Sequence, residues 1–292
     1  MLLIKKLLFQ TAFVLLTTVP AGAGLVGANM PVHYALYPGQ RCSSARNSLL
    51  EATLVDVAQT EYFPPEDLLT FDVDQVLLDR GWSGSWHTVI NTSNLDWPED
   101  LLPKKPGQKV LLIVQSDFSG PGDQYLMTVL PRAQDHLAVV TDEHEARRVV
   151  ESELLVQLTP DQPDRRLTAL IQALLPILTP PNVGNLRPFL SHPSAMVRRA
   201  ALGATMAAAP DAETAQLIGK DLQSFFSQGG ESLEALFLSY PFLDPRSRSW
   251  GSSWGDEAEA YDRICELIFS HSHLSPAALK LFTPEHPASE HR

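Results

Sequence analysis

Cysteine is scarce in this chain, which has only Cys42 and Cys265 among 292 residues. Neither belongs to a CxxC motif or lies beside a pair of histidines, so a cysteine-based metal site is excluded. If the chain is exported into an oxidising compartment, the two thiols can join in a disulfide. The alternative is two separate buried thiols, and the sequence leaves both open.

Positive charge is also in short supply. The chain has 22 Lys and Arg residues against 34 Asp and Glu residues, which gives a formal net charge of −12. A negative field repels phosphate backbones, and no cluster of Lys and Arg alternates with aromatic residues. We therefore expect neither nucleic acid nor an anionic lipid surface as a partner.

The sequence has no apolar run of the roughly 20 residues that a membrane span requires. The nearest approach is at the N-terminus, where Lys5 and Lys6 precede an apolar stretch at 7–19 and small residues follow at 20–23. This pattern predicts a cleavable signal peptide over residues 1–23, with an uncleaved anchor as the alternative. We expect an exported protein, periplasmic or secreted, with no stable membrane insertion after cleavage.

After an irregular lead-in at 24–46, the chain shows the period-two alternation that is typical of β-strands. Clusters of Gly and Pro separate the segments, and no helical pattern lies between them. The run 110–114 is apolar at every position, which indicates a strand covered on both faces. The alternation slips after Asp74, which predicts a bulge. The predicted strands lie at 50–55, 69–78, 86–91, 110–114, 125–130 and 137–140.

Six short strands without intervening helices predict an antiparallel barrel or sandwich over residues 47–142. The order, with a long second strand ending in VLLDRG and a later GQKVLLIV strand, resembles the OB-like barrels of exported proteins, including netrin-like modules. One hypothesis is therefore an inhibitor-like β module acting on an extracellular protease. Inhibitors of that class reach a metal through a cysteine at the mature N-terminus. Here Cys42 lies well inside the chain, so that chemistry does not carry over.

From residue 143 to 283 the apolar spacing becomes helical, which completes an α+β chain of two domains. Thr141 or Asp142 can cap the first helix, and Asp211 can cap a later one. A polar tail follows at 284–292. The residues expected to face inward include Ala146, Val150, Leu154, Leu167, Leu170, Ile218, Leu222, Ile264, Cys265 and Ile268.

The segment 186–204, LRPFLSHPSAMVRRAALGA, carries the most specific pattern of the helical half. An apolar turn with a proline is followed by a polar break and then by a helix with Val197 and three alanines on one face. The segment resembles one unit of a HEAT repeat, including the Val197-Arg198 pair, although family units commonly carry Asp where this chain has His192. A single unit cannot bury both of its faces, so neighbouring helices must stack on it.

The resemblance to HEAT repeats implies a helical surface that binds another protein or peptide, or a spacer. We expect Arg187, Arg198 and Arg199 to lie on the outside and to form the interaction surface, since they stand out in an acidic chain. A short helical bundle with solvated arginines is the alternative.

Catalytic patterns are sparse in this sequence. GSSWG at 251–255 satisfies GxSxG, so a serine hydrolase centred on Ser253 is an alternative function, but a nucleophile elbow needs a buried strand before the serine, and 244–249 is polar. His271 and His273 follow an expected helix end, where a cation is an ordinary feature. We predict no cofactor and no metal. The sequence favours an exported, non-enzymatic protein–protein interaction or scaffold module.

Overall fold

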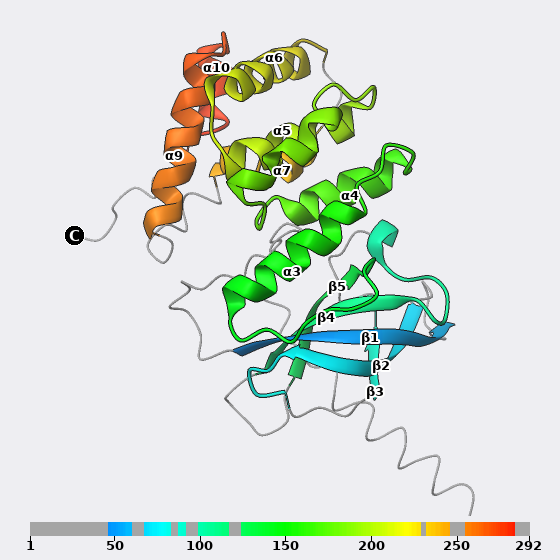
Figure 1. Cartoon of the computed structure of the whole chain (residues 1–292). Helices are drawn as coiled ribbons and strands as arrows, with labels where there is room; N and C mark the ends of the chain where they lie inside the picture. Colours follow the sequence, from blue (N-terminus) through cyan, green and yellow to red (C-terminus); the bar gives the residue numbers. More distant parts are fainter. Residues whose placement is uncertain are drawn as a thin grey trace, which may run out of the picture.

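The structure is a computed structural model that describes residues 46–59, 67–82, 87–91, 99–116, 124–228, 232–245 and 255–283. These residues confirm an α+β chain, with an antiparallel sheet followed by helices (Figure 1). The strands are β1 (Arg46–Gln59), β2 (Asp67–Leu78), β3 (His87–Asn91), β4 (Lys109–Ser116) and β5 (Gln124–Pro131), and the short 3-10 helix η2 (Glu99–Leu101) precedes β4. The later elements are α3 (Glu143–Val156), α4 (Asp164–Leu174), the 3-10 helix η3 (Pro180–Phe189), α5 (Ala195–Ala208), α6 (Ala212–Gln228), α7 (Leu233–Ser239), the 3-10 helix η4 (Pro241–Leu243), α9 (Gly255–Ser270) and α10 (Pro276–Lys280).

The five described strands form one antiparallel sheet in the order β3-β2-β1-β4-β5. The central strand β1 pairs with β2 on one side and with β4 on the other. The β1–β2 register skips Asp74 and Leu77, which confirms the break in alternation expected at this point of β2. All five described strands belong to this one sheet.

The strand predicted over residues 137–140 is wrong, because this segment has no strand conformation. It lies near the sheet, and the Val140 N–H donates a hydrogen bond to the Leu77 backbone oxygen at 2.8 Å. Leu137 and Val140 pack against the core beneath α3. The apolar pattern at these positions therefore reflects contact with the core and not strand pairing.

Both faces of the sheet are buried. Leu50, Leu54 and Phe71 belong to a cluster on one face, and all three are fully buried. Residues 110–114 of β4 are buried at every position, which confirms the prediction of a strand covered on both faces. The apolar run arises because its alternate side chains enter two different cores.

One of these cores joins the sheet to the first two helices and crosses the domain boundary expected after residue 142. The strands and the helices each bury an apolar face in this core, so separating the sheet from the helices would expose both faces to water. Its members include Leu49, Leu78, Leu111, Ile113 and Leu130 of the sheet, Ala146, Val150 and Leu154 of α3, and Leu170 and Leu174 of α4.

The later helices stack one after another away from the sheet (Figure 1). Helix α5 is central, because Val197 and Ala201 pack in a cluster with α4 and η3, while Leu202 and Met206 pack in another with α6 and α7. The first half of the 186–204 segment ends the 3-10 helix η3 and is not an α-helix. Prolines at the start of η3 and at Pro188 lack the N–H donors that a regular α-helix uses.

Candidate functional site

The three arginines expected to share one surface lie in different surroundings. Arg187 is exposed on η3. Arg198 turns back on the loop before α5, where its Nη1 donates to the backbone oxygens of His192 and Pro193, both at 2.7 Å. Arg198 therefore holds the turn between η3 and α5, and only Arg187 of these two is directed mainly to solvent.

Arg199 links α5 to α6, so the expectation that it lies on the outside is wrong. Its Nε donates to Asp221 Oδ2 at 2.8 Å, and the two side chains are only 11% and 17% exposed. Its guanidinium also lies over the Phe225 ring, 5.7 Å from the centroid. The Tyr240 hydroxyl donates to the same Asp221 oxygen at 3.2 Å. Burial, and next the charge of Asp221, raises the pKa of Tyr240 well above its ordinary value of 10.0, so the hydroxyl stays a donor.

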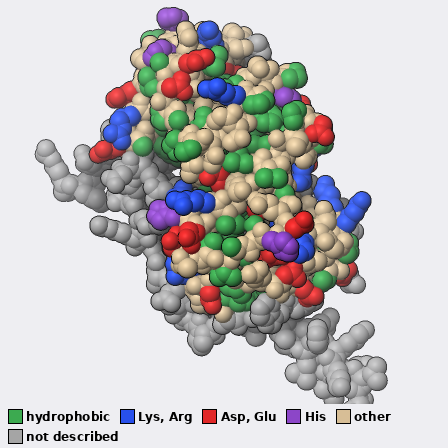
Figure 2. All heavy atoms as spheres, in the orientation of Figure 1, with side chains coloured by type: hydrophobic (Ala, Val, Ile, Leu, Met, Phe, Trp, Pro, Cys, Tyr) green, Lys and Arg blue, Asp and Glu red, His purple; other side chains and the backbone are tan. Residues whose placement is uncertain are grey.

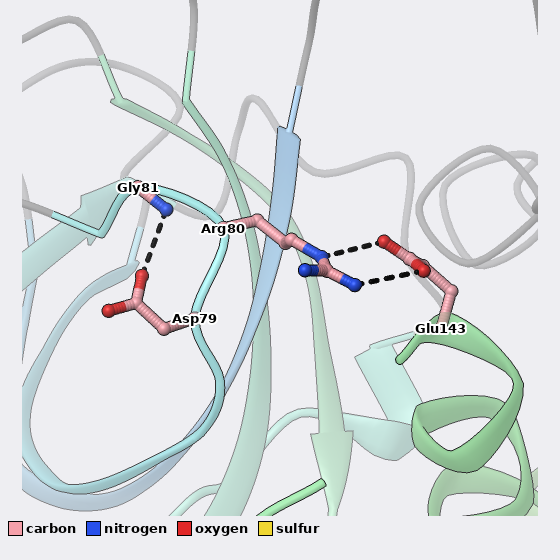
Figure 3. Close-up of a pocket in the computed structure, with 4 residues that line it drawn as sticks. All are labelled: Asp79, Arg80, Gly81 and Glu143. Carbon is pink, nitrogen blue, oxygen red and sulfur yellow. Dashed lines mark hydrogen bonds and ion pairs between the residues drawn. The ribbon is translucent and has the colours of Figure 1, made fainter. Parts of the chain in front are cut away.

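A first hollow, of about 680 Å³, lies where the end of β2 meets the start of α3. Figure 3 shows Arg80 and Glu143 reaching toward one another, while Asp79 points to the backbone of Gly81. Arg80 Nε and Nη2 donate to the two carboxylate oxygens of Glu143 at 2.7 and 3.2 Å. This hydrogen-bonded pair lowers the pKa of Glu143.

The polar groups of this hollow serve the fold. Asp79 Oδ1 accepts from the N–H groups of Gly81 and Trp82 at 2.9 and 3.0 Å, and Gly81 has a φ of +95°, which favours glycine. The Arg80 N–H donates to Ser48 Oγ at 3.0 Å. Next to this hollow, Asp142 caps α3 by accepting from the Glu145 N–H at 2.9 Å, so Asp142 and not Thr141 is the cap among the two that the sequence offers. These contacts therefore hold α3 against the sheet, and we call the Arg80–Glu143 pair the clasp.

A second hollow, of about 260 Å³, lies at the rim of the core that joins the sheet to α3 and α4. We call it the cationic hollow, because Lys109, Arg132 and Arg166 all line it, beside Gln157. Lys109 begins β4, Arg132 follows β5, and Arg166 lies in the first turn of α4. Three elements distant in sequence thus bring positive charge to one place.

The strand alternation explains why charged groups meet at this rim. Leu49 and Glu51 lie on the same face of β1, since their positions differ by two. Leu49 enters the apolar core, whereas Glu51 meets Lys109 and Arg132. Glu51 Oε1 accepts from Arg132 Nη1 and also from Lys109 Nζ, the latter at 3.3 Å. Buried charges need such partners, because unpaired ones cost several kcal/mol or more, as an order of magnitude.

Sequence reasoning missed the cationic hollow. Lys109, Arg132 and Arg166 are far apart along the chain, and no local pattern brings them together. The one available signal is Glu51, a charged residue between apolar ones in a strand, and such a residue ordinarily marks the solvent face. Here it is only 5% exposed.

A cluster of phenylalanines joins α6, α7, α9 and the end of α10. Of these helices, α6 and α10 lie at the end of the stack farthest from the sheet (Figure 1). Phe226, Phe237 and Phe269 surround Phe282, with ring centroids 6.0, 6.2 and 5.7 Å from it. Phe282 is buried, whereas the other three are partly exposed. The adjacent Leu238 and Leu281 are 40% and 44% exposed. We call these residues the aromatic end: Phe226, Phe237, Leu238, Phe269, Leu281 and Phe282.

The remaining sequence predictions concern the two cysteines, Ser253 and the histidines after α9. Cys42 and Ser253 lie outside the described residues, so the disulfide and the hydrolase stay predictions. Cys265 is buried, and its Sγ donates to the Phe242 backbone oxygen at 3.0 Å. His271 and His273 follow the end of α9, as expected.

The described part of the chain contains no group of three or more His, Cys, Asp or Glu side chains that could hold a metal ion. Within the same ranges, no helix combines the length and the apolar character needed to cross a membrane.

Comparisons of the chain with protein-family models, with curated proteins and with solved structures gave no significant match.

Proposed function

We propose that the protein is an exported, non-enzymatic module that binds another protein or a peptide through the aromatic end of its helical stack. The carrying observation is that three partly exposed phenylalanines pack around Phe282, and that exposed leucines are the sequence neighbours of Phe237 and Phe282. Scattered apolar residues on a surface are normal, but grouped ones mark interaction sites. Aromatic and large apolar side chains also make up the buried centre of protein interfaces.

The aromatic end is supported from below by a buried core. Tyr240, Phe242 and Ile268 are fully buried in the cluster that also contains Phe282. The Arg199–Asp221 pair holds α5 against α6 beside it. Figure 2 shows hydrophobic side chains reaching the surface over the helical half of the molecule. A surface fixed in this way loses little conformational entropy on binding, which favours affinity.

Two local features support the resemblances proposed from the sequence. Arg198 ties the turn before α5 to its own helix, which gives the 186–204 segment a fixed angle, as a HEAT-like unit requires. The order β3-β2-β1-β4-β5 is compatible with a five-stranded OB-like barrel that is open between β3 and β5. We propose that the HEAT-like stack binds the partner and that the OB-like sheet is its base.

The test is affinity capture with the full chain from separate extracytoplasmic and cytoplasmic fractions. Leu281→Asp places a charge in the aromatic end, and Val139→Asp is the matched control, since Val139 is 63% exposed on the segment before α3. We expect the same partner with the wild type and with Val139→Asp, and its loss with Leu281→Asp. Charging one central interface residue costs about 2 kcal/mol or more, roughly thirtyfold in affinity.

Three outcomes would count against this proposal. Equal recovery with Leu281→Asp would show that the aromatic end is not the binding surface. Failure to capture a partner from either fraction would refute the binding function. Capture only from the cytoplasmic fraction would refute export.

A further inference from the structure

We infer that the cationic hollow is a binding site for a small oxyanion, either a phosphate or a short carboxylate. This site is distinct from the aromatic end and does not depend on the proposed protein partner. It rests on the charge of the lining, on a buried donor without an acceptor, and on the size of the hollow.

The first observation is an excess of positive charge. Lys109, Arg132 and Arg166 line the hollow, and none of the described residues that line it carries a carboxylate. Glu51 contacts two of these cations, because its Oε1 accepts from both Lys109 and Arg132. The described lining therefore gathers three cations in a chain whose net charge is −12, while the nearby buried carboxylate of Glu153 accepts from the N–H groups of Ala133 and Gln134. Like charges gathered this closely repel one another, and an anion in the hollow would attract all three.

The second observation is an unsatisfied donor on Arg132. The Arg132 side chain is 1% exposed, its Nη1 donates to Glu51, and its Nη2 donates to the Asp135 backbone oxygen at 2.7 Å. Its Nε is buried and has no hydrogen-bond partner. Buried donors without acceptors are rare because they lose their hydration. Since Arg132 lines the hollow, an oxyanion bound there could supply the acceptor.

The other two cations are placed to complete the site. Arg166 is held by two bonds, from Nη1 to the Asp100 backbone oxygen at 2.9 Å and from Nη2 to Gln157 Oε1 at 3.1 Å. It also lies in the first turn of α4, where the helix dipole adds positive potential. Lys109 is 51% exposed, so its ammonium group can move toward an entering ligand. The hollow is thus lined by one fixed cation, Arg166, and one movable cation, Lys109.

The size of the hollow selects among anions. Pockets for drug-sized ligands measure roughly 300–1,000 Å³. At about 260 Å³, this hollow suits a phosphate or a dicarboxylate better than a nucleotide. Guanidinium groups bind both kinds of oxyanion through paired hydrogen bonds, so the shared chemistry is the oxyanion itself.

The test is titration of the full chain at low ionic strength with sodium phosphate and, separately, with sodium succinate. Sodium chloride at matched ionic strength corrects for screening. Binding is followed by calorimetry and by the rise in melting temperature. Lys109→Met and Arg166→Met each remove one cation, and Arg187→Met removes an exposed arginine elsewhere as the control. Arg132 is left intact, because its loss would leave Glu51 buried without its main partner.

We expect one phosphate or succinate per chain, with about tenfold weaker binding in Lys109→Met and Arg166→Met, as for the loss of one charge-assisted hydrogen bond. Arg187→Met should bind as the wild type does. Tighter binding of phosphate or of succinate shows which of the two classes of oxyanion the site prefers. The inference is overturned if neither salt does more than chloride, or if both variants bind like the wild type. If Arg166→Met fails to fold, the half-exposed Lys109→Met decides the question.

Discussion

Gly203 lies where α5 passes directly over the end of α7. A Cβ atom added to Gly203 would lie 1.9 Å from the Ser239 backbone oxygen and 3.4 Å from Cδ1 of Tyr240. The first contact is with the backbone, so no side-chain rotation can relieve it. Gly203→Ala therefore forces α5 and α7 apart in the middle of the helical stack.

The magnitude of this effect follows from two opposing terms. Replacing a helical glycine with alanine gains about 1 kcal/mol of helix propensity. Overpacking a tight contact costs about 1–3 kcal/mol, and a clash with backbone belongs at the upper limit. The net loss in the free energy of unfolding is therefore about 2 kcal/mol. For a chain of this size that lowers the melting temperature by about 4–8 °C.

Thermal denaturation followed by circular dichroism measures this loss. Gly184→Ala is the matched control, because nothing lies within 4 Å of its added Cβ. The control should change the free energy of unfolding by less than about 0.5 kcal/mol. A Gly203→Ala variant as stable as the wild type would show that α5 and α7 do not pack as described.

Three further predictions concern the charged contacts. Arg199→Met should lower the free energy of unfolding by about 3 kcal/mol in urea denaturation, because it leaves the largely buried Asp221 without its cation. Arg187→Met, at an exposed position, is the control and should change this free energy by less than about 0.5 kcal/mol. Equal effects of the two substitutions would contradict the packing of α5 on α6. Since Arg80 holds the pKa of Glu143 below its ordinary value of 4.5, their contact stabilises the fold fully above that pH and is lost as the pH falls through the lowered pKa. The difference in melting temperature between the wild type and Glu143→Gln should thus be constant from pH 7 to about 5 and shrink toward pH 3, and a constant difference down to pH 3 would refute the clasp. Asp142→Ala should cost about 1 kcal/mol through loss of the helix cap, as measured by urea denaturation, and Asp161→Ala, outside any helix, is its control.

Local patterns were sufficient to predict most elements. Alternation placed β1, β2 and β3, a continuous apolar run placed β4, and the break in β2 at Asp74 was visible as a slip of the alternation. The sequence also indicated the helix caps. Asp142 and Asp211 each accept a hydrogen bond from the backbone N–H three residues later, at 2.9 and 2.8 Å. These features depend on neighbours in sequence, which is why they could be predicted.

Features that depend on tertiary contacts were predicted poorly. The apolar residues at 137–140 pack on the core without forming a strand, and periodicity does not separate these two cases. Arg199 looked external because α5 has a clear apolar stripe, yet α6 covers a second side of the same helix. Helical spacing identifies one buried face, but it does not reveal how many neighbours a central helix has.

Neither candidate site could be assembled from the sequence. Lys109, Arg132 and Arg166 meet only because α3 and α4 pack on the sheet, and Glu51 becomes buried for the same reason. The aromatic end likewise needs the late helices to bring Phe226 and Phe269 to Phe282. Residue types suggested neither site, since each type occurs elsewhere in the chain without such a role.

The central claim, that the aromatic end binds a partner, is tested most directly by hydrogen–deuterium exchange of the full chain with and without the captured protein. The account predicts that added partner slows exchange in residues 233–239 and 276–283, and that this protection disappears in Leu281→Asp. Protection confined to β1–β5, or protection that persists unchanged in Leu281→Asp, would contradict it.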